Sequence, residues 1–128
     1  MRFPYDTAHR PTLPIALRGP SGKIQLTALV DSGADVNVLP WGVGRELGLV
    51  WNPNKATLRL VGAMERSAAM PVLLELSMAG FEPVTQAFAW CQSDAVKAVL
   101  GQTNFFMEFD VCFFRSKSEF AVEWRTNA

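Results

Sequence analysis

The chain has 128 residues, of which 49% are hydrophobic and 19% charged, the balance of an ordinary globular protein. Its 12 basic and 12 acidic residues cancel at pH 7, so the charge does not support binding of nucleic acid or another polyanion. No apolar run approaches the roughly 20 residues that a membrane span needs, and the first residues lack the apolar segment of a secretory signal. We therefore expect one cytoplasmic domain over residues 1–128, in which residues 1–11 form either an arm or a flexible tail.

Apolar and polar residues alternate along most of the chain, and this period of two is typical of β-strands. The segments 13–17 and 23–30 flank a Gly-Pro-Ser-Gly turn at residues 19–22, which predicts a hairpin. Further strands are expected at residues 36–39, 58–61, 72–78, 84–90, 109–114 and 120–124, and short helices at 41–47 and 102–107. Residues 62–67 interrupt the alternation and predict the projecting tip of a hairpin. The pattern predicts the all-β class, mainly β with one or two short helices, in a closed or folded-over sheet.

Several kinds of catalytic site are hard to build from this sequence. The only histidine, His9, lies in a proline-flanked N-terminal stretch, so Ser32 has no convincing base for nucleophilic catalysis. The spacing after Asp31 does not fit a calcium loop, because Val36 stands where such a loop requires glycine. Neither the two cysteines nor the glycines have the spacing of a zinc site or a phosphate-binding loop. We therefore expect no metal and no cofactor.

The most informative segment is Leu29-Val30-Asp31-Ser32-Gly33-Ala34-Asp35, which follows a strand with apolar residues at alternate positions. A buried strand that ends in a tight Ser-Gly turn holds the Asp31 carboxylate rigidly. One ionised carboxylate is a poor general base, but two of them about 3 Å apart cannot both ionise. One can then take a proton from water while the other donates a proton to a carbonyl oxygen. Asp35 lies beyond the turn, so the suitable partner is a second Asp31 across a two-fold axis.

This segment resembles the catalytic signature of the retroviral-type (retropepsin-like) aspartic proteases, a hydrophobic pair followed by Asp-[Ser/Thr]-Gly-Ala. Val99-Leu100-Gly101 and the short helix after it are similar to a second element of that family. The resemblance covers roughly residues 12–124 and implies a retropepsin-like closed barrel, one half of an acid protease. Since the chain carries one signature, the resemblance implies a homodimer that hydrolyses an extended peptide or protein substrate.

The resemblance also implies a role for each matching residue. Asp31 would be the catalytic acid, one per subunit, acting on water without a covalent intermediate. Ser32, Leu100 and Gly101 would support the active-site loops, with Ser32 locking the two loops across the axis. Substrate contacts would come from the loop residues Gly33, Ala34 and Asp35 and from a flap at residues 62–67, through Gly62, Ala63, Met64 and Glu65. Two departures from the family pattern are the single glycine of this flap and Gln102, which stands where many members have arginine.

Two other functions remain open at this point. One is a non-catalytic dimerisation or peptide-binding module of the same fold, in which the cleft is occluded or the two acids do not meet. The other is a monomeric β-barrel that binds a small ligand and is indifferent to Asp31. The intact Asp31-Ser32-Gly33 sequence favours the enzyme.

Overall fold

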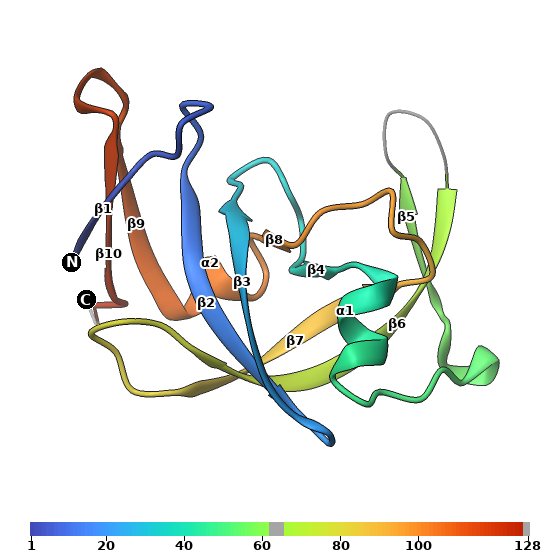
Figure 1. Ribbon diagram of the computed structural model, residues 1–128. Helices are drawn as coiled ribbons and strands as arrows, with labels where there is room; N and C mark the ends of the chain where they lie inside the picture. Colours follow the sequence, from blue (N-terminus) through green and yellow to red (C-terminus); the bar gives the residue numbers. More distant parts are fainter. Residues whose placement is uncertain (62–65, 127–128) are drawn as a thin grey trace.

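The larger of two sheets forms a closed barrel (Figure 1) in the computed structural model, which describes residues 1–61 and 66–126. Its strands are β2 (Thr12–Gly19), β3 (Gly22–Val30), β4 (Val38–Leu39), β5 (Leu58–Val61), β6 (Arg66–Ser77), β7 (Val84–Cys91) and β8 (Val99–Leu100). They are hydrogen-bonded in the order β2-β3-β8-β4-β7-β6-β5. An additional pairing of β2 with β6 closes the ring, and β5 extends from β6.

A smaller antiparallel sheet contains both ends of the chain. It consists of β1 (Arg2–Pro4), β9 (Phe109–Phe114) and β10 (Glu119–Trp124), in the order β1-β10-β9. The Met1 amino group donates a hydrogen bond to the Val122 carbonyl at 2.8 Å, so the N-terminus lies beside the last strand (Figure 1).

Helical segments are short: α1 (Trp41–Glu46), α2 (Phe105–Glu108) and the 3₁₀ turns η1 (Pro53–Lys55) and η2 (Arg115–Lys117). α1 packs closely on β7, because a Cβ at Gly44 would lie 2.1 Å from Trp90 Nε1. The Trp90 indole is fully buried and stacks on Trp41, with ring centroids 4.8 Å apart. Gly48 follows the helix with φ +83°, a left-handed conformation that glycine adopts without strain.

The core follows the alternation seen in the sequence. In β2, Leu13, Ile15 and Leu17 are at most 3% exposed, whereas the residues between them face outward. The largest other fully buried side chains are Trp90, Phe105, Phe109, Phe120, Leu39, Leu47, Leu76, Leu100, Val30 and Val122. The all-β class with two short α-helices is thus confirmed, and so is the hairpin of β2 and β3 across Gly19 and Gly22.

Some predicted boundaries were wrong. β4 begins at Val38, not at residue 36, because residues 31–37 form a loop that is hydrogen-bonded elsewhere. β6 begins at Arg66, not at residue 72, since the small side chains of Ala68 and Ala69 pair with β5 without an alternating signal. α2 begins at Phe105 rather than 102, after a turn that carries the chain past the loop. Strand β1 and both 3₁₀ turns were not predicted, while residues 62–65 of the expected hairpin tip lie outside the described residues.

Candidate active site

Asp31 follows the last residue of β3, at the point where three strands meet. β8 lies between β3 and β4, pairing parallel with β3 and antiparallel with β4. The loop 31–37 therefore joins two strands that flank a third. The Asp31 N–H donates to the Leu100 carbonyl at 3.0 Å, which continues the β3–β8 pairing and fixes the Asp31 backbone.

The Asp31 side chain closes the turn that follows it. Its Oδ1 accepts a hydrogen bond from the Gly33 N–H at 2.9 Å, and its carbonyl accepts one from Ala34 N–H at 3.1 Å. This Asx-type geometry is common for aspartate at turns. The second carboxylate oxygen, Oδ2, makes no hydrogen bond with residues 1–59 or 67–126, and the side chain is half-buried. One oxygen is thus held in place while the other is available to water or to another carboxyl group.

The segment after β8 braces the other side of the loop. The Gln102 side chain donates to the Ser32 carbonyl at 2.8 Å, and its backbone N–H donates to the Ala34 carbonyl at 2.9 Å. Thr103 donates to the Asp35 carbonyl through both its N–H and its hydroxyl, at 2.9 and 2.8 Å. In the described part of the chain the Asp35 carboxylate has no ion pair and is exposed. Gln102, which stands where many members of the resembled family have arginine, therefore holds the loop backbone through its side chain and its N–H.

A buried asparagine, Asn37, connects the loop to the rest of the barrel. It is 0% exposed, and its side-chain oxygen accepts hydrogen bonds from Gly101 N–H at 2.9 Å and Phe105 N–H at 3.4 Å. Its other hydrogen bonds go to Asn104 Oδ1, Gln86 Oε1, the Ala87 carbonyl and the Ala89 N–H. Asn37 was not among the residues predicted for the site, although its lone amide within the apolar run 36–39 was a usable signal.

The backbone of Gly101 packs against the loop 31–37 and leaves no space for a side chain. A Cβ there would lie 2.4 Å from the Val36 carbonyl oxygen, far closer than atoms can approach. Leu100, immediately before it, is fully buried. The structure therefore brings Asp31, Ser32, Gly33, Ala34 and Asp35 together with Leu100 and Gly101. The flap residues Gly62, Ala63, Met64 and Glu65 lie outside the described residues.

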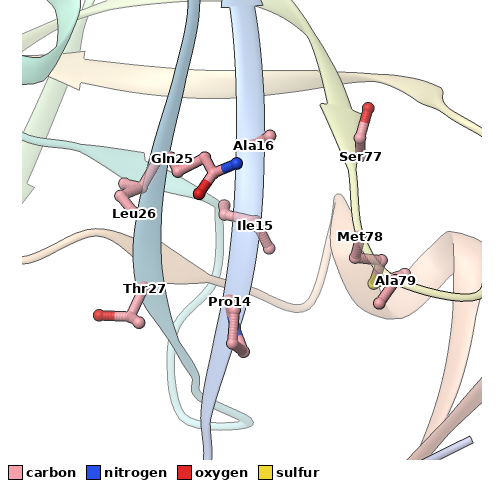
Figure 2. Close-up of a pocket in the computed structure, with 9 residues that line it drawn as sticks. All are labelled: Pro14, Ile15, Ala16, Gln25, Leu26, Thr27, Ser77, Met78 and Ala79. Atoms are coloured by element: carbon pink, nitrogen blue, oxygen red, sulfur yellow. The ribbon is translucent and has the colours of Figure 1, made fainter.

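A larger hollow of the barrel does not belong to this loop. A cavity of about 500 Å³ lies farther along the β2–β3 hairpin, towards the end of β6 (Figure 2). Its polar side chains are Gln25, Thr27 and Ser77, and none of its lining residues titrates. In the part of the chain that the structure covers, no group of three or more His, Cys, Asp or Glu could hold a metal ion, and no helix could span a membrane.

The barrel is similar to solved structures of two proteases. A retropepsin-like aspartic protease from Rickettsia conorii matches with a TM-score of 0.70 at 15% identity, covering 96% of this chain and 97% of that one. This is a retropepsin-like fold. The EIAV protease, solved with an inhibitor, matches with a TM-score of 0.59 at 18% identity, covering 77% of this chain and 88% of that one. No protein-family model and no curated protein matches the sequence.

The retropepsin-like fold expected from the sequence is therefore confirmed. The two segments that carried the resemblance, residues 29–35 and 99–101, are the ones that meet around Asp31. Identities of 15% and 18% establish the fold and leave the activity to be argued from the site.

Proposed function

We propose that the protein is a homodimeric aspartic endopeptidase, in which two Asp31 carboxylates, one per subunit, activate a water molecule. The observation that carries this proposal is the geometry of Asp31, whose Oδ1 is held by Gly33 N–H while Oδ2 has no partner among the described residues. In a retropepsin-like fold, a carboxylate with one oxygen fixed by a hydrogen bond and the other oxygen available can exchange a proton with water.

The proposed reaction needs both carboxyl groups, one ionised and one protonated. The ionised group accepts a proton from water as the water oxygen attacks the scissile carbonyl carbon, and the protonated group donates to the carbonyl oxygen. The C–N bond then breaks as the amide nitrogen takes up a proton, and no covalent intermediate with the enzyme forms. Ser32 would join the two loops across the axis.

A second subunit is required because this chain supplies one suitable acid. Asp35 is not the second acid, because it lies in the part of the loop that leads to β4. There the Thr103 hydroxyl donates a hydrogen bond to the Asp35 carbonyl at 2.8 Å. The match also covers 97% of the solved Rickettsia conorii protease chain. A two-fold axis near Asp31 would supply the second acid from an identical copy.

The substrate would be an extended peptide that binds as an added strand. Gly33, Ala34 and Asp35 would contact the peptide backbone from the loop. The flap between β5 and β6, with Gly62, Ala63, Met64 and Glu65, would close over it.

The decisive test compares proteolysis of an unfolded protein by the wild type and by Asp31→Asn, at mildly acid and neutral pH. Replacing the carboxylate removes the general base, so we expect cleavage to fall about 10³-fold or more. Asp94→Asn is the matched control, because Asp94 is exposed and accepts a hydrogen bond from Gly42 N–H, which asparagine can also accept. Equal activity of Asp31→Asn and wild type would contradict the proposal, whereas a dimer without any cleavage would identify a non-catalytic module.

A further inference from the structure

A smaller cavity is lined by Leu29, two residues before Asp31, and the charged residues of its lining are both basic. It has a volume of about 370 Å³, and its lining includes Arg10, Thr12, Leu29, Lys97 and Ala98. We call it the basic pocket. It adjoins the larger cavity in Figure 2, with which it shares Leu26 and Thr27, but the lining of that larger cavity has no charged residue.

The basic pocket lies on the same face of the β2–β3 hairpin as Asp31. Alternate residues of a strand point to one face, so Leu29 shares the face of Asp31. Thr12 is directly opposite Leu29, and the Val30 N–H donates to the Pro11 carbonyl at 2.9 Å. Arg10 precedes Pro11, and its carbonyl accepts hydrogen bonds from Asp6 N–H and Thr12 N–H, so the chain turns there and leaves the β2–β3 register.

The far wall of the basic pocket is fixed to the same strand. The Ala98 carbonyl accepts a hydrogen bond from Leu29 N–H at 3.0 Å, just before β8 pairs with β3. Lys97 precedes this contact and lines the pocket. The two basic residues therefore come from opposite sides, Arg10 from the segment before β2 and Lys97 from the segment before β8.

The two positive charges differ in how far they are neutralised. Arg10 Nε lies 3.4 Å from Asp6 Oδ2, so its charge is shared with that carboxylate. Lys97 forms no ion pair with the described residues and is exposed. No acidic residue lines the pocket, and Leu29 and Ala98 give it apolar walls. Such a pocket complements a side chain that has methylene groups and a terminal negative charge.

We infer that the basic pocket selects an acidic side chain of the substrate, glutamate or aspartate, through Lys97. This inference rests on the proposed function, because it places the substrate peptide along the face of Asp31. A strand rises about 3.3 Å per residue, and Leu29 is two residues from Asp31, so the selected side chain lies within about four residues of the scissile bond. The same charge disfavours a basic side chain at that position.

The experiment starts from the cleavage sites of the wild type in an unfolded protein, mapped by mass spectrometry. Matched synthetic peptides then carry Glu or Gln at each position within four residues of the cleaved bond. We expect the best Glu peptide to have a kcat/KM about two- to fivefold above its Gln partner, the range of a partly exposed ion pair, and this ratio to fall as salt is added. Lys97→Met should remove the preference, and Lys97→Glu should reverse it in favour of a Lys peptide.

Lys23→Met is the matched control, since Lys23 is exposed at the start of β3 and does not line the pocket. The preference should survive in this variant. A wild type that cleaves Glu and Gln peptides equally, or a preference that persists in Lys97→Met, would overturn the inference and leave the proposed function standing.

Binding separates this inference from the proposed function. Fluorescence anisotropy of labelled Glu and Gln peptides with Asp31→Asn measures selection without cleavage. If the wild type cleaves nothing, the same comparison is made with one extended peptide that carries Glu or Gln at successive positions. Tighter, Lys97-dependent binding of a Glu peptide then means that the proposed function fails and the pocket assignment holds. Equal binding of both peptides refutes the assignment independently of activity.

Discussion

At the scale of single residues, Asn37 shows how the Asp31 loop is held. It is fully buried, and both atoms of its amide form hydrogen bonds with neighbouring segments. A buried polar group that loses its hydrogen-bond partner lowers the free energy of unfolding by about 1–3 kcal/mol. The Asn37 side chain therefore stabilises the fold mainly by bonding the buried polar groups around it, and less through the volume that it fills.

We therefore expect Asn37→Leu to lower the free energy of unfolding by about 2–4 kcal/mol, because Gly101 N–H and Gln86 Oε1 would lose their partner in a buried site. Urea unfolding followed by tryptophan fluorescence measures the change. Asn54→Leu is the control, since Asn54 is exposed in η1 and should change stability by less than about 0.5 kcal/mol. An equally small effect at Asn37 would contradict the role assigned to it.

Two glycines of the site should respond differently to alanine. At Gly101 a Cβ would overlap the Val36 carbonyl oxygen, so Gly101→Ala should cost about 1–3 kcal/mol of stability through displacement of the loop. At Gly33 the nearest atom to a Cβ is the Asp31 carboxylate oxygen, at 3.2 Å, so alanine should shift that side chain by a few tenths of an ångström and leave the fold intact. Thermal unfolding and peptide cleavage together distinguish them: Gly33→Ala should remain folded while losing cleavage, because its Cβ would stand where the substrate backbone approaches. A Gly33→Ala variant that cleaves normally would remove Gly33 from the substrate site.

At the scale of elements, the β-strands and the loop were predictable to different degrees. The alternation of residues 13–17 identified β2, and the Gly-Pro-Ser-Gly turn identified its hairpin with β3, because both signals are local. The two-residue strands β4 and β8 are stabilised by pairing with distant segments, so no local pattern marks their partners. Residues 31–35 were found from sequence, but the bracing by Gln102, Thr103 and Asn37 depends on contacts across roughly 65–70 positions.

The turn between β1 and β2 is organised by Asp6. The pKa of the Asp6 carboxyl lies below its ordinary value of 3.8, chiefly because the Arg10 backbone N–H donates to it, helped by Ala8 N–H, the Arg10 guanidinium and the Thr12 hydroxyl. A carboxyl whose pKa is lowered on folding stabilises the fold above its unfolded pKa, and this contribution is lost as the pH falls through the folded pKa.

We accordingly expect the backbone amides of Ala8 and Arg10 to be protected from hydrogen exchange at neutral pH and to lose protection below about pH 3.8. Asp6→Ala should show low protection of both amides at every pH. Protection that is unchanged by acid, or by this substitution, would show that the turn is held by other contacts.

At the scale of the whole molecule, the barrel and the three-stranded sheet account for one half of the proposed enzyme. The sequence predicted the retropepsin-like fold, because residues 29–35 resemble the catalytic signature of that family and residues 99–101 resemble its second, glycine-containing element. It could not predict that β1 pairs with β10 in the same chain, since residues 2–4 include a proline and have no alternating pattern.

If two copies assemble the site, activity per subunit should fall on dilution in step with the dimer fraction measured by analytical ultracentrifugation. Adding excess Asp31→Asn subunits to the wild type should lower activity further, because mixed dimers have one acid. Adding Asp94→Asn subunits should not. Constant activity per subunit in a solution that contains only monomers would refute the dimeric mechanism.

The two thiols of the chain lie in opposite environments: Cys91 is fully buried in β7, and Cys112 is exposed on β9. A nitroxide reagent applied to the unmodified protein will therefore attach at one place. In a symmetric pair, the two nitroxides define a single spin–spin distance, measurable by pulsed electron paramagnetic resonance. This distance will report how two copies are arranged around their axis, with no cysteine introduced or removed.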